Sequence, residues 1–194
     1  MKPTCSCRHH AASDTASGER RQFLSLAVWG ALAAATGLAA CGERTGSGAA
    51  LAPLEIDAAT SCELDGMLLA DYPGPKAQIF YAGQAKPVYF CDTVELFNTL
   101  LRPEQVRKVV AVYVQDMGQA DWEQPRGHWI DAKTALYVLG SKRHGSMGPT
   151  LASFAQALAA EKFIAQYGGK LLRYTEVKPE MVDLSGGALH DTRM

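Results

Sequence analysis

The side chains best suited to chemistry in this chain are sulfur donors in two distant loops. Cys62 and Met67 flank Gly66 in the first loop, and Met147 lies far downstream within residues 145–150. A glycine lets the backbone turn sharply, so the Met67 sulfur can return towards the Cys62 sulfur. Thiol and thioether sulfurs are soft donors, which select Cu(I) over hard cations. We therefore predict Cys62, Met67 and Met147 as candidate Cu(I) ligands.

Each of these residues also has a simpler structural interpretation. Met147 can be a buried residue that anchors its loop, although its neighbours are loop formers without helical or strand periodicity. Cys62 lies in the polar segment 60–66 and is predicted to be exposed, whereas most free cysteines are buried. Cys62 and Met67 alone make a weak metal-binding motif. A purely structural role for both residues, in packing their loop, therefore stays open.

Four other residues of similar chemistry are weighed in the same way. Cys91 has three interpretations: a small buried residue, a disulfide partner of Cys62, or a further thiolate ligand. A disulfide would consume the thiol that Cu(I) needs, so we favour the buried residue and, after it, the ligand. His128 and His144 are weaker candidates, because isolated loop histidines are usually solvated. Met117 closes a long strand and is expected to pack between two lobes.

The N-terminus resembles a bacterial lipoprotein signal peptide of the twin-arginine type, residues 1–40. A pair of arginines, Arg20-Arg21, precedes the uncharged apolar run 23–40, which ends at Cys41 in a lipobox-like pattern. We expect Cys41 to carry lipid and the domain to be periplasmic and anchored to the membrane. An uncleaved single-span anchor is the alternative.

The expected processing decides which parts of the chain can carry function. Cleavage would remove the cysteines and histidines of residues 5–10, which otherwise look like a metal cluster. Residues 41–59 are rich in Gly, Ala and Ser and are predicted to form a flexible tether. The folded domain is predicted to span residues 60–182, followed by a frayed tail at 183–194.

Composition and motifs exclude several classes of function. The chain has 19 Lys+Arg and 20 Asp+Glu, a formal net charge of −1, and no basic stripe, so no nucleic-acid partner is expected. It lacks a nucleophile elbow, a zinc-protease motif and a phosphate-binding glycine loop, so we expect no enzyme. Two alternatives stay open: a lipid-tethered interaction module of a membrane assembly complex, and a thiol enzyme that pairs Cys62 with a histidine.

Hydrophobic patterns in the first half predict two strands, a helix and a third strand. Residues 76–81 and 86–90 are strand candidates around a short hairpin connection. Asp92 and Glu95 have the spacing of a capping box and precede a helical apolar face. Residues 106–114 are apolar and β-branched, as in a buried strand.

The second half predicts the same plan with little sequence identity. Strands are expected at residues 128–130 and 134–139, then a helix that starts at Pro149, and a last strand at residues 170–174. We therefore predict the α+β class, with two similar ββαβ lobes.

The two lobes are predicted at about residues 60–117 and 118–178. A further short strand is expected at residues 67–70, near the start of the first lobe.

Six short blocks of unusual sequence follow one another through the predicted domain: Cys62-x-x-Asp65-Gly66-Met67, residues 71–79, Phe90-Cys91-Asp92-Thr93, Gln115-Asp116-Met117, residues 127–132 and residues 145–150. In this order they resemble the NosL family, lipoprotein accessory factors of bacterial nitrous-oxide reductase. The resemblance covers about residues 60–182. It implies a periplasmic Cu(I) metallochaperone with a two-lobe ββαβ architecture.

The resemblance also implies partners and ligands. It implies delivery of copper for the copper-sulfide centre of the reductase, together with an ABC-type transporter and a periplasmic solenoid protein. The family's ligand cysteine falls on Cys62 and its ligand methionine on Met147, while Met67 matches a methionine shared by the family. Many relatives have a second cysteine at the position of Asp65, so the coordination number in this chain stays open.

Overall fold

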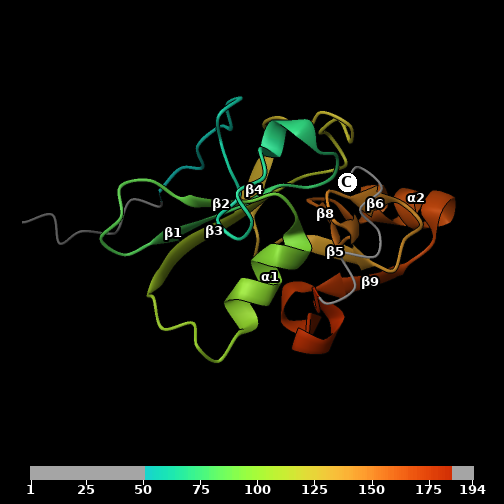
Figure 1. The fold of residues 1–194 in the computed structure, drawn as a ribbon. Helices are drawn as coiled ribbons and strands as arrows, with labels where there is room; N and C mark the ends of the chain where they lie inside the picture. The colour runs from blue at the N-terminus through green and yellow to red at the C-terminus, as the bar shows by residue number, and fades with distance from the viewer. Residues whose placement is uncertain (1–50, 185–194) are drawn as a thin grey trace, which may run out of the picture. The chain divides into compact units, whose positions relative to one another are not determined.

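The computed structural model describes residues 51–184, which belong to one compact unit, Gly46–Met194. The expected signal peptide, the lipidation site Cys41 and residues 185–194 of the expected tail lie outside the described residues. Within residues 51–184, no helix is both long and apolar enough to cross a membrane. The predicted α+β class is confirmed, because the structure combines α-helices with antiparallel sheets (Figure 1).

The first antiparallel sheet has the strand order β2-β1-β3-β4. Its strands are β1 (Ala77–Tyr81), β2 (Val88–Phe90), β3 (Val109–Gln115) and β4 (Trp129–Asp131). β1 pairs with both β2 and β3, and all five of its residues are buried. This strand is therefore an inner strand of the sheet, with hydrogen-bonded neighbours on both sides.

The second antiparallel sheet, β8-β5-β9, repeats the topology of the first. Its elements are β5 (Leu136–Leu139), β8 (Ala152–Phe154), the helix α2 (Ala157–Tyr167) and β9 (Lys170–Arg173). In each half the helix joins the second and third strands, and the first strand lies between those two in the sheet. A small hairpin, β6 (His144–Gly145) and β7 (Gly148–Pro149), is inserted between β5 and β8.

The predicted division of the lobes differs from the structure. β4 pairs with β3, so residues 129–131 complete the first sheet instead of starting the second. The boundary at residue 117 is therefore wrong for the sheets. The expected strand at 67–70 is also wrong, because Leu69–Asp71 forms a 3-10 turn and Leu68 makes one isolated bridge with Ser61.

The second helix begins later in the structure than the sequence predicts. Pro149 lies in β7, and the buried residues Ala152–Phe154 pair with β5 as a strand before the helix begins at Ala157. Proline suits the first turn of a helix, but its fixed φ also suits a short edge strand, so the residue alone does not distinguish the two. Short 3-10 turns at Tyr174–Glu176 and Pro179–Met181 end the described chain.

The helix α1 (Thr93–Leu101) follows β2 directly and is capped as predicted at its first turn. Asp92 is the N-cap, and its carboxylate accepts a hydrogen bond from the Val94 amide at 2.9 Å. Glu95 does not complete the capping box. Its side chain is buried instead, as are those of the next two residues, Leu96 and Phe97.

One hydrophobic core joins the two halves. Ile79 and Val114 of the first sheet belong to the same buried cluster as Tyr137 and Leu172 of the second. The Phe97 ring of α1 packs edge-on to Tyr137, with ring centroids 4.9 Å apart. The halves therefore share this core, while a second buried cluster, which includes Val138, Phe154 and Phe163, lies between α2 and the second sheet.

Residues 51–57, which fall within the expected tether, make specific contacts with the domain. The Leu54 backbone exchanges two hydrogen bonds with the Gln78 side chain, each 2.9 Å long. Arg126 donates to the Ile56 carbonyl at 2.8 Å, and the Ile56 side chain is buried. The ordered domain thus begins before residue 60, earlier than composition suggested.

Phe97→Ala is expected to destabilise the protein by about 3–5 kcal/mol, because it leaves a cavity where α1 meets the second sheet. Urea unfolding followed by tryptophan fluorescence should show one transition for the whole domain at a lower midpoint. Leu158→Ala is the matched control: this side chain is 63% exposed on α2, and its loss should change stability by less than about 0.5 kcal/mol. Two separate transitions would contradict a shared core.

Candidate metal centre

The three predicted ligands lie around one small buried cluster. Its buried members are Ile56, Cys62, Leu69 and Cys91, and the partly buried side chains packed against it are Met67, Tyr89, Trp129 and Met147. The fold therefore brings the predicted sulfur residues together from segments far apart in the sequence. It also adds the Cys91 sulfur to the same group of packed side chains, which we call the pocket.

The loop of residues 62–67 folds back on itself as its glycine suggested. The Cys62 amide donates to the Met67 carbonyl at 2.8 Å, and the Gly66 amide donates to the Cys62 carbonyl at 3.0 Å. Gly66 has φ +77°, which an L side chain rarely adopts. The loop closes tightly and carries Cys62 into the interior, so its predicted exposure is wrong: the residue is only 4% exposed.

Cys91 is fully buried between the end of β2 and the N-cap of α1, as the favoured interpretation predicted. Cys62 and Cys91 are both free thiols in the structure, so they form no disulfide here. Burial does not exclude Cys91 as a further thiolate ligand, because its sulfur faces the same pocket as that of Cys62.

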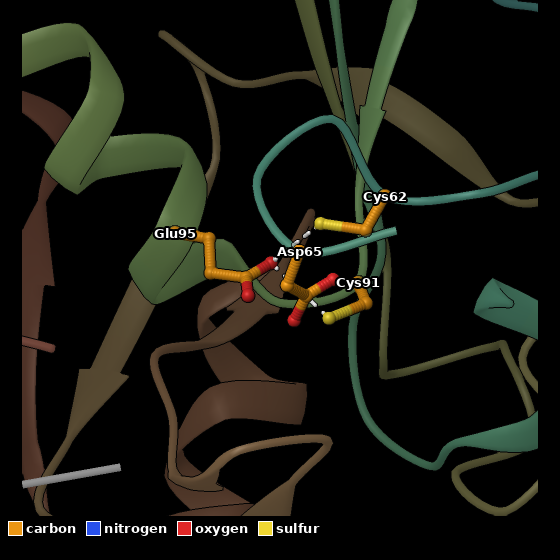
Figure 2. A group of neighbouring side chains, drawn as sticks. All are labelled: Cys62, Asp65, Cys91 and Glu95. Atoms are coloured by element: carbon orange, nitrogen blue, oxygen red, sulfur yellow. Dashed lines mark hydrogen bonds between the residues drawn. The ribbon is translucent and has the colours of Figure 1, made fainter. Parts of the chain in front are cut away.

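Glu95 joins the two thiols (Figure 2). Its Oε2 atom lies 3.2 Å from the Cys62 sulfur and 3.2 Å from the Cys91 sulfur, and each thiol can donate to it. Asp65 completes the group: one donor atom from each of the four residues lies within 4.8 Å of the others. Unlike the other three, Asp65 is exposed, and its carboxylate accepts from the Met67 amide at 2.9 Å.

Glu95 is a member of the candidate site that the sequence did not predict, because its position in a capping box explained it without any contact with Cys62. The available signal is its spacing four residues after Cys91 at the start of a helix, where such residues face the same side. Burial in the fold, which a local pattern does not reveal, turns the carboxylate towards the thiols.

The acids of the pocket ionise unequally. A hydrogen bond from the Cys91 thiol is the largest cause that lowers the pKa of Cys62, from 9.0 to about 6. The pKa of Cys91 is raised, first by its hydrogen bond to Cys62 and then by burial. Burial, followed by the nearby Cys62 charge, raises the pKa of Glu95 to about 9. Negative charge at neutral pH therefore concentrates on Cys62.

A buried lysine lies beneath these acids. Lys76 is fully buried, and its Nζ donates to the backbone carbonyls of Pro73 at 2.9 Å and Cys91 at 3.0 Å. Burial lowers the pKa of Lys76 to about 8, although the nearby acids, Asp92 first, oppose this shift. The ammonium therefore keeps most of its charge at neutral pH and offsets part of the negative charge in the pocket.

Met147 reaches the pocket from the turn between β6 and β7. The preceding residue, Ser146, has its hydroxyl 2.9 Å from the Cys91 carbonyl oxygen and 3.3 Å from the Cys91 sulfur. Both Met67 and Met147 are half-buried, whereas both thiols are buried. The thiols thus form the inner side of the site and the thioethers its outer side.

The remaining candidates lie elsewhere. Met117 packs with Trp122, Val138 and Phe154 in a separate cluster, which agrees with the predicted packing role. His128 and His144 are both exposed, and neither belongs to the cysteine and carboxylate group identified within residues 51–184. No histidine therefore pairs with Cys62 in that group, as the thiol-enzyme alternative would require.

Together, the fold and the site define an α+β domain with a buried, sulfur-rich candidate metal centre. The family model for NosL matches residues 53–182, and the chain belongs to this family. This confirms the resemblance noted in the sequence.

Named relatives and a solved structure are similar over most of the domain. The chain is 37% identical over 162 residues to a copper-binding lipoprotein NosL of Stutzerimonas stutzeri, covering 81% of this chain and 84% of the relative. It is 36% identical over 149 residues to a copper-binding lipoprotein NosL of Achromobacter cycloclastes, covering 75% and 76%. The crystal structure of the copper chaperone NosL from Shewanella denitrificans aligns with TM-score 0.64 and 42% identity, over 68% of this chain and 98% of that one.

Cys91→Ala is expected to raise the pKa of Cys62 from about 6 towards 9.0, because it removes the hydrogen bond that contributes most to the shift. Ultraviolet thiolate absorbance of the metal-free protein against pH measures this directly. Wild type should keep its thiolate down to about pH 6, and the variant should lose it at a higher pH. An unchanged midpoint would contradict the coupling of the two thiols.

The lowered pKa of Cys62 also makes the stability of the folded protein depend on pH. Because the folded-state pKa of Cys62 lies below its unfolded value of 9.0, the thiolate stabilises the fold fully above pH 9. That contribution is lost as the pH falls to about 6. The loss should be smaller in Cys91→Ala.

Proposed function

We propose that this protein binds Cu(I) with Cys62, Met67 and Met147 as ligands and carries it as a chaperone in the cell envelope. One observation carries the proposal: all three residues, selected for their chemistry, pack around one buried cluster. The names of the relatives, copper-binding lipoprotein and copper chaperone, support copper as the cargo.

The chemistry of the donors favours the cuprous ion. Thiolates and thioethers are soft ligands, and a site that combines them selects Cu(I). Because the pKa of Cys62 is about 6, this sulfur is a thiolate at neutral pH and binds metal without first losing a proton. Cys91 is not counted among these ligands, because its raised pKa keeps the proton on its sulfur, which shares a Glu95 oxygen with Cys62.

The unequal burial of the sulfur atoms suits a carrier better than a store. The thiols are buried, while Met67 and Met147 are half-buried and reach the pocket from two separate loops. A partner can displace a half-buried thioether first and leave the ion held by thiolate during transfer. A fully closed four-ligand site would retain the metal instead.

The proposed setting follows from the N-terminus and from the family. Lipid on Cys41 anchors the domain to a membrane on the periplasmic side. The proposed destination of the copper is the copper-sulfide centre of nitrous-oxide reductase, reached with an ABC-type transporter and a periplasmic solenoid protein. The family membership of the chain supports this setting.

Anaerobic competition for Cu(I) against a soluble chelator tests the ligand set. Cys62→Ala should lose most of the affinity, because it removes the ionised thiolate. Met67→Leu and Met147→Leu should weaken binding by about tenfold each, since a thioether is replaced by an isosteric group without a donor.

Met117→Leu is the matched control for the methionine variants. It makes the same substitution in a buried cluster away from the pocket, so binding should equal that of wild type. Equal binding by wild type and all four variants would overturn the ligand assignment. Absence of stoichiometric binding by reduced wild type would leave a tethered interaction module.

A further inference from the structure

The turn between β6 and β7 places Ser146 directly before Met147 and ties it to a thiol-bearing residue. The Ser146 hydroxyl has one proton and two acceptors within reach, the Cys91 carbonyl oxygen at 2.9 Å and the Cys91 sulfur at 3.3 Å. β6 and β7 are in register at Gly145 and Gly148, so Ser146 and Met147 are the two residues of the turn. A contact that holds one of them restricts the other.

The acceptor of this hydrogen bond is itself fixed. The Cys91 carbonyl also receives a hydrogen bond from the Lys76 ammonium at 3.0 Å, and the same ammonium binds the Pro73 carbonyl. Lys76 is fully buried, and Cys91 lies directly before the N-cap of α1. Ser146 therefore donates to a carbonyl oxygen that the buried Lys76 ammonium also holds.

The base of the hairpin is held independently of Ser146. The Thr150 hydroxyl donates to Asp92 at 2.7 Å, and the Trp122 ring nitrogen donates to the His144 carbonyl at 3.0 Å. Gly145 packs so closely that an added Cβ would clash with Asp92 Oδ2. Loss of the Ser146 hydroxyl should therefore leave the hairpin in place and release only its tip.

We propose that Ser146 is a positioning residue for Met147: its hydrogen bond to Cys91 holds the thioether against the two thiols and so sets the share of Cu(I) affinity that Met147 contributes. The inference rests on the proposed function, because it requires Met147 to be a ligand. A methionine has three rotatable side-chain bonds, and a turn that is already fixed before the ion arrives reduces the entropy lost on binding.

A double-mutant cycle between Ser146→Ala and Met147→Leu tests this in the full-length protein, with Cu(I) affinity measured by chelator competition. Ser146→Ala alone should weaken binding by about two- to tenfold, the range expected for one hydrogen bond. In the Met147→Leu background the same substitution should cause no further loss, because the group that it positions is gone.

Ser141→Ala is the matched control. Ser141 is buried close to the same hairpin and donates to the Arg143 carbonyl at 3.1 Å, an equivalent bond that does not touch Cys91. This variant should bind Cu(I) as wild type does. A loss equal to that of Ser146→Ala would overturn the proposal and indicate a general effect on the hairpin.

A second measurement needs no copper. The Met147 methyl resonance of the metal-free protein should move towards the position of a mobile methionine in Ser146→Ala but not in Ser141→Ala. An unmoved resonance, or an equal loss of affinity in both methionine backgrounds, would overturn the positioning role. If wild type binds Cu(I) normally, either of these results would overturn the role of Ser146 and leave the proposed Cu(I) carrier function intact. If wild type does not bind Cu(I), both proposals are overturned.

Discussion

The pocket depends on one constraint: a single buried carboxylate oxygen contacts two buried thiols. Cys62, Cys91 and Glu95 are all acids, and groups this close in a poorly solvated place cannot all ionise. The interaction separates their pKa values, so that Cys62 has a lowered value while Cys91 and Glu95 have raised ones. At neutral pH the pocket thus has one thiolate, on Cys62, while Cys91 and Glu95 keep their protons.

The first turn of α1 is the element that makes this contact, and much of the fold serves to fix it. The Asp92 cap sets where the helix begins, and Phe97 locks the helix against Tyr137 of the second sheet. Lys76, directly before the inner strand β1, supplies a buried positive charge and a hydrogen bond to Cys91. The same arrangement that buries the acids therefore also offsets part of their charge.

The two halves share a topology but contribute differently to the site. The first provides both thiols and the carboxylate, and the second provides Met147 through the β6–β7 hairpin, an insertion with no counterpart in the described first half. The halves share one core, and the hydrogen bond from Ser146 to the Cys91 carbonyl places the hairpin beside the thiols. A site assembled in this way can have a rigid inner side and an exchangeable outer side.

The sequence by itself determined the strands and helix of the first ββαβ unit, the Asp92 cap and the sulfur residues, because periodicity, caps and soft donors are local properties. Only the tertiary structure decided that β4 joins the first sheet and that Ala152–Phe154 is a strand, since pairing depends on partners distant in sequence. It also decided that Cys62 is buried and that Glu95 turns from its helix towards two thiols. The contact between Cys62 and Glu95 joins residues 33 apart in the sequence, so no local pattern contains it.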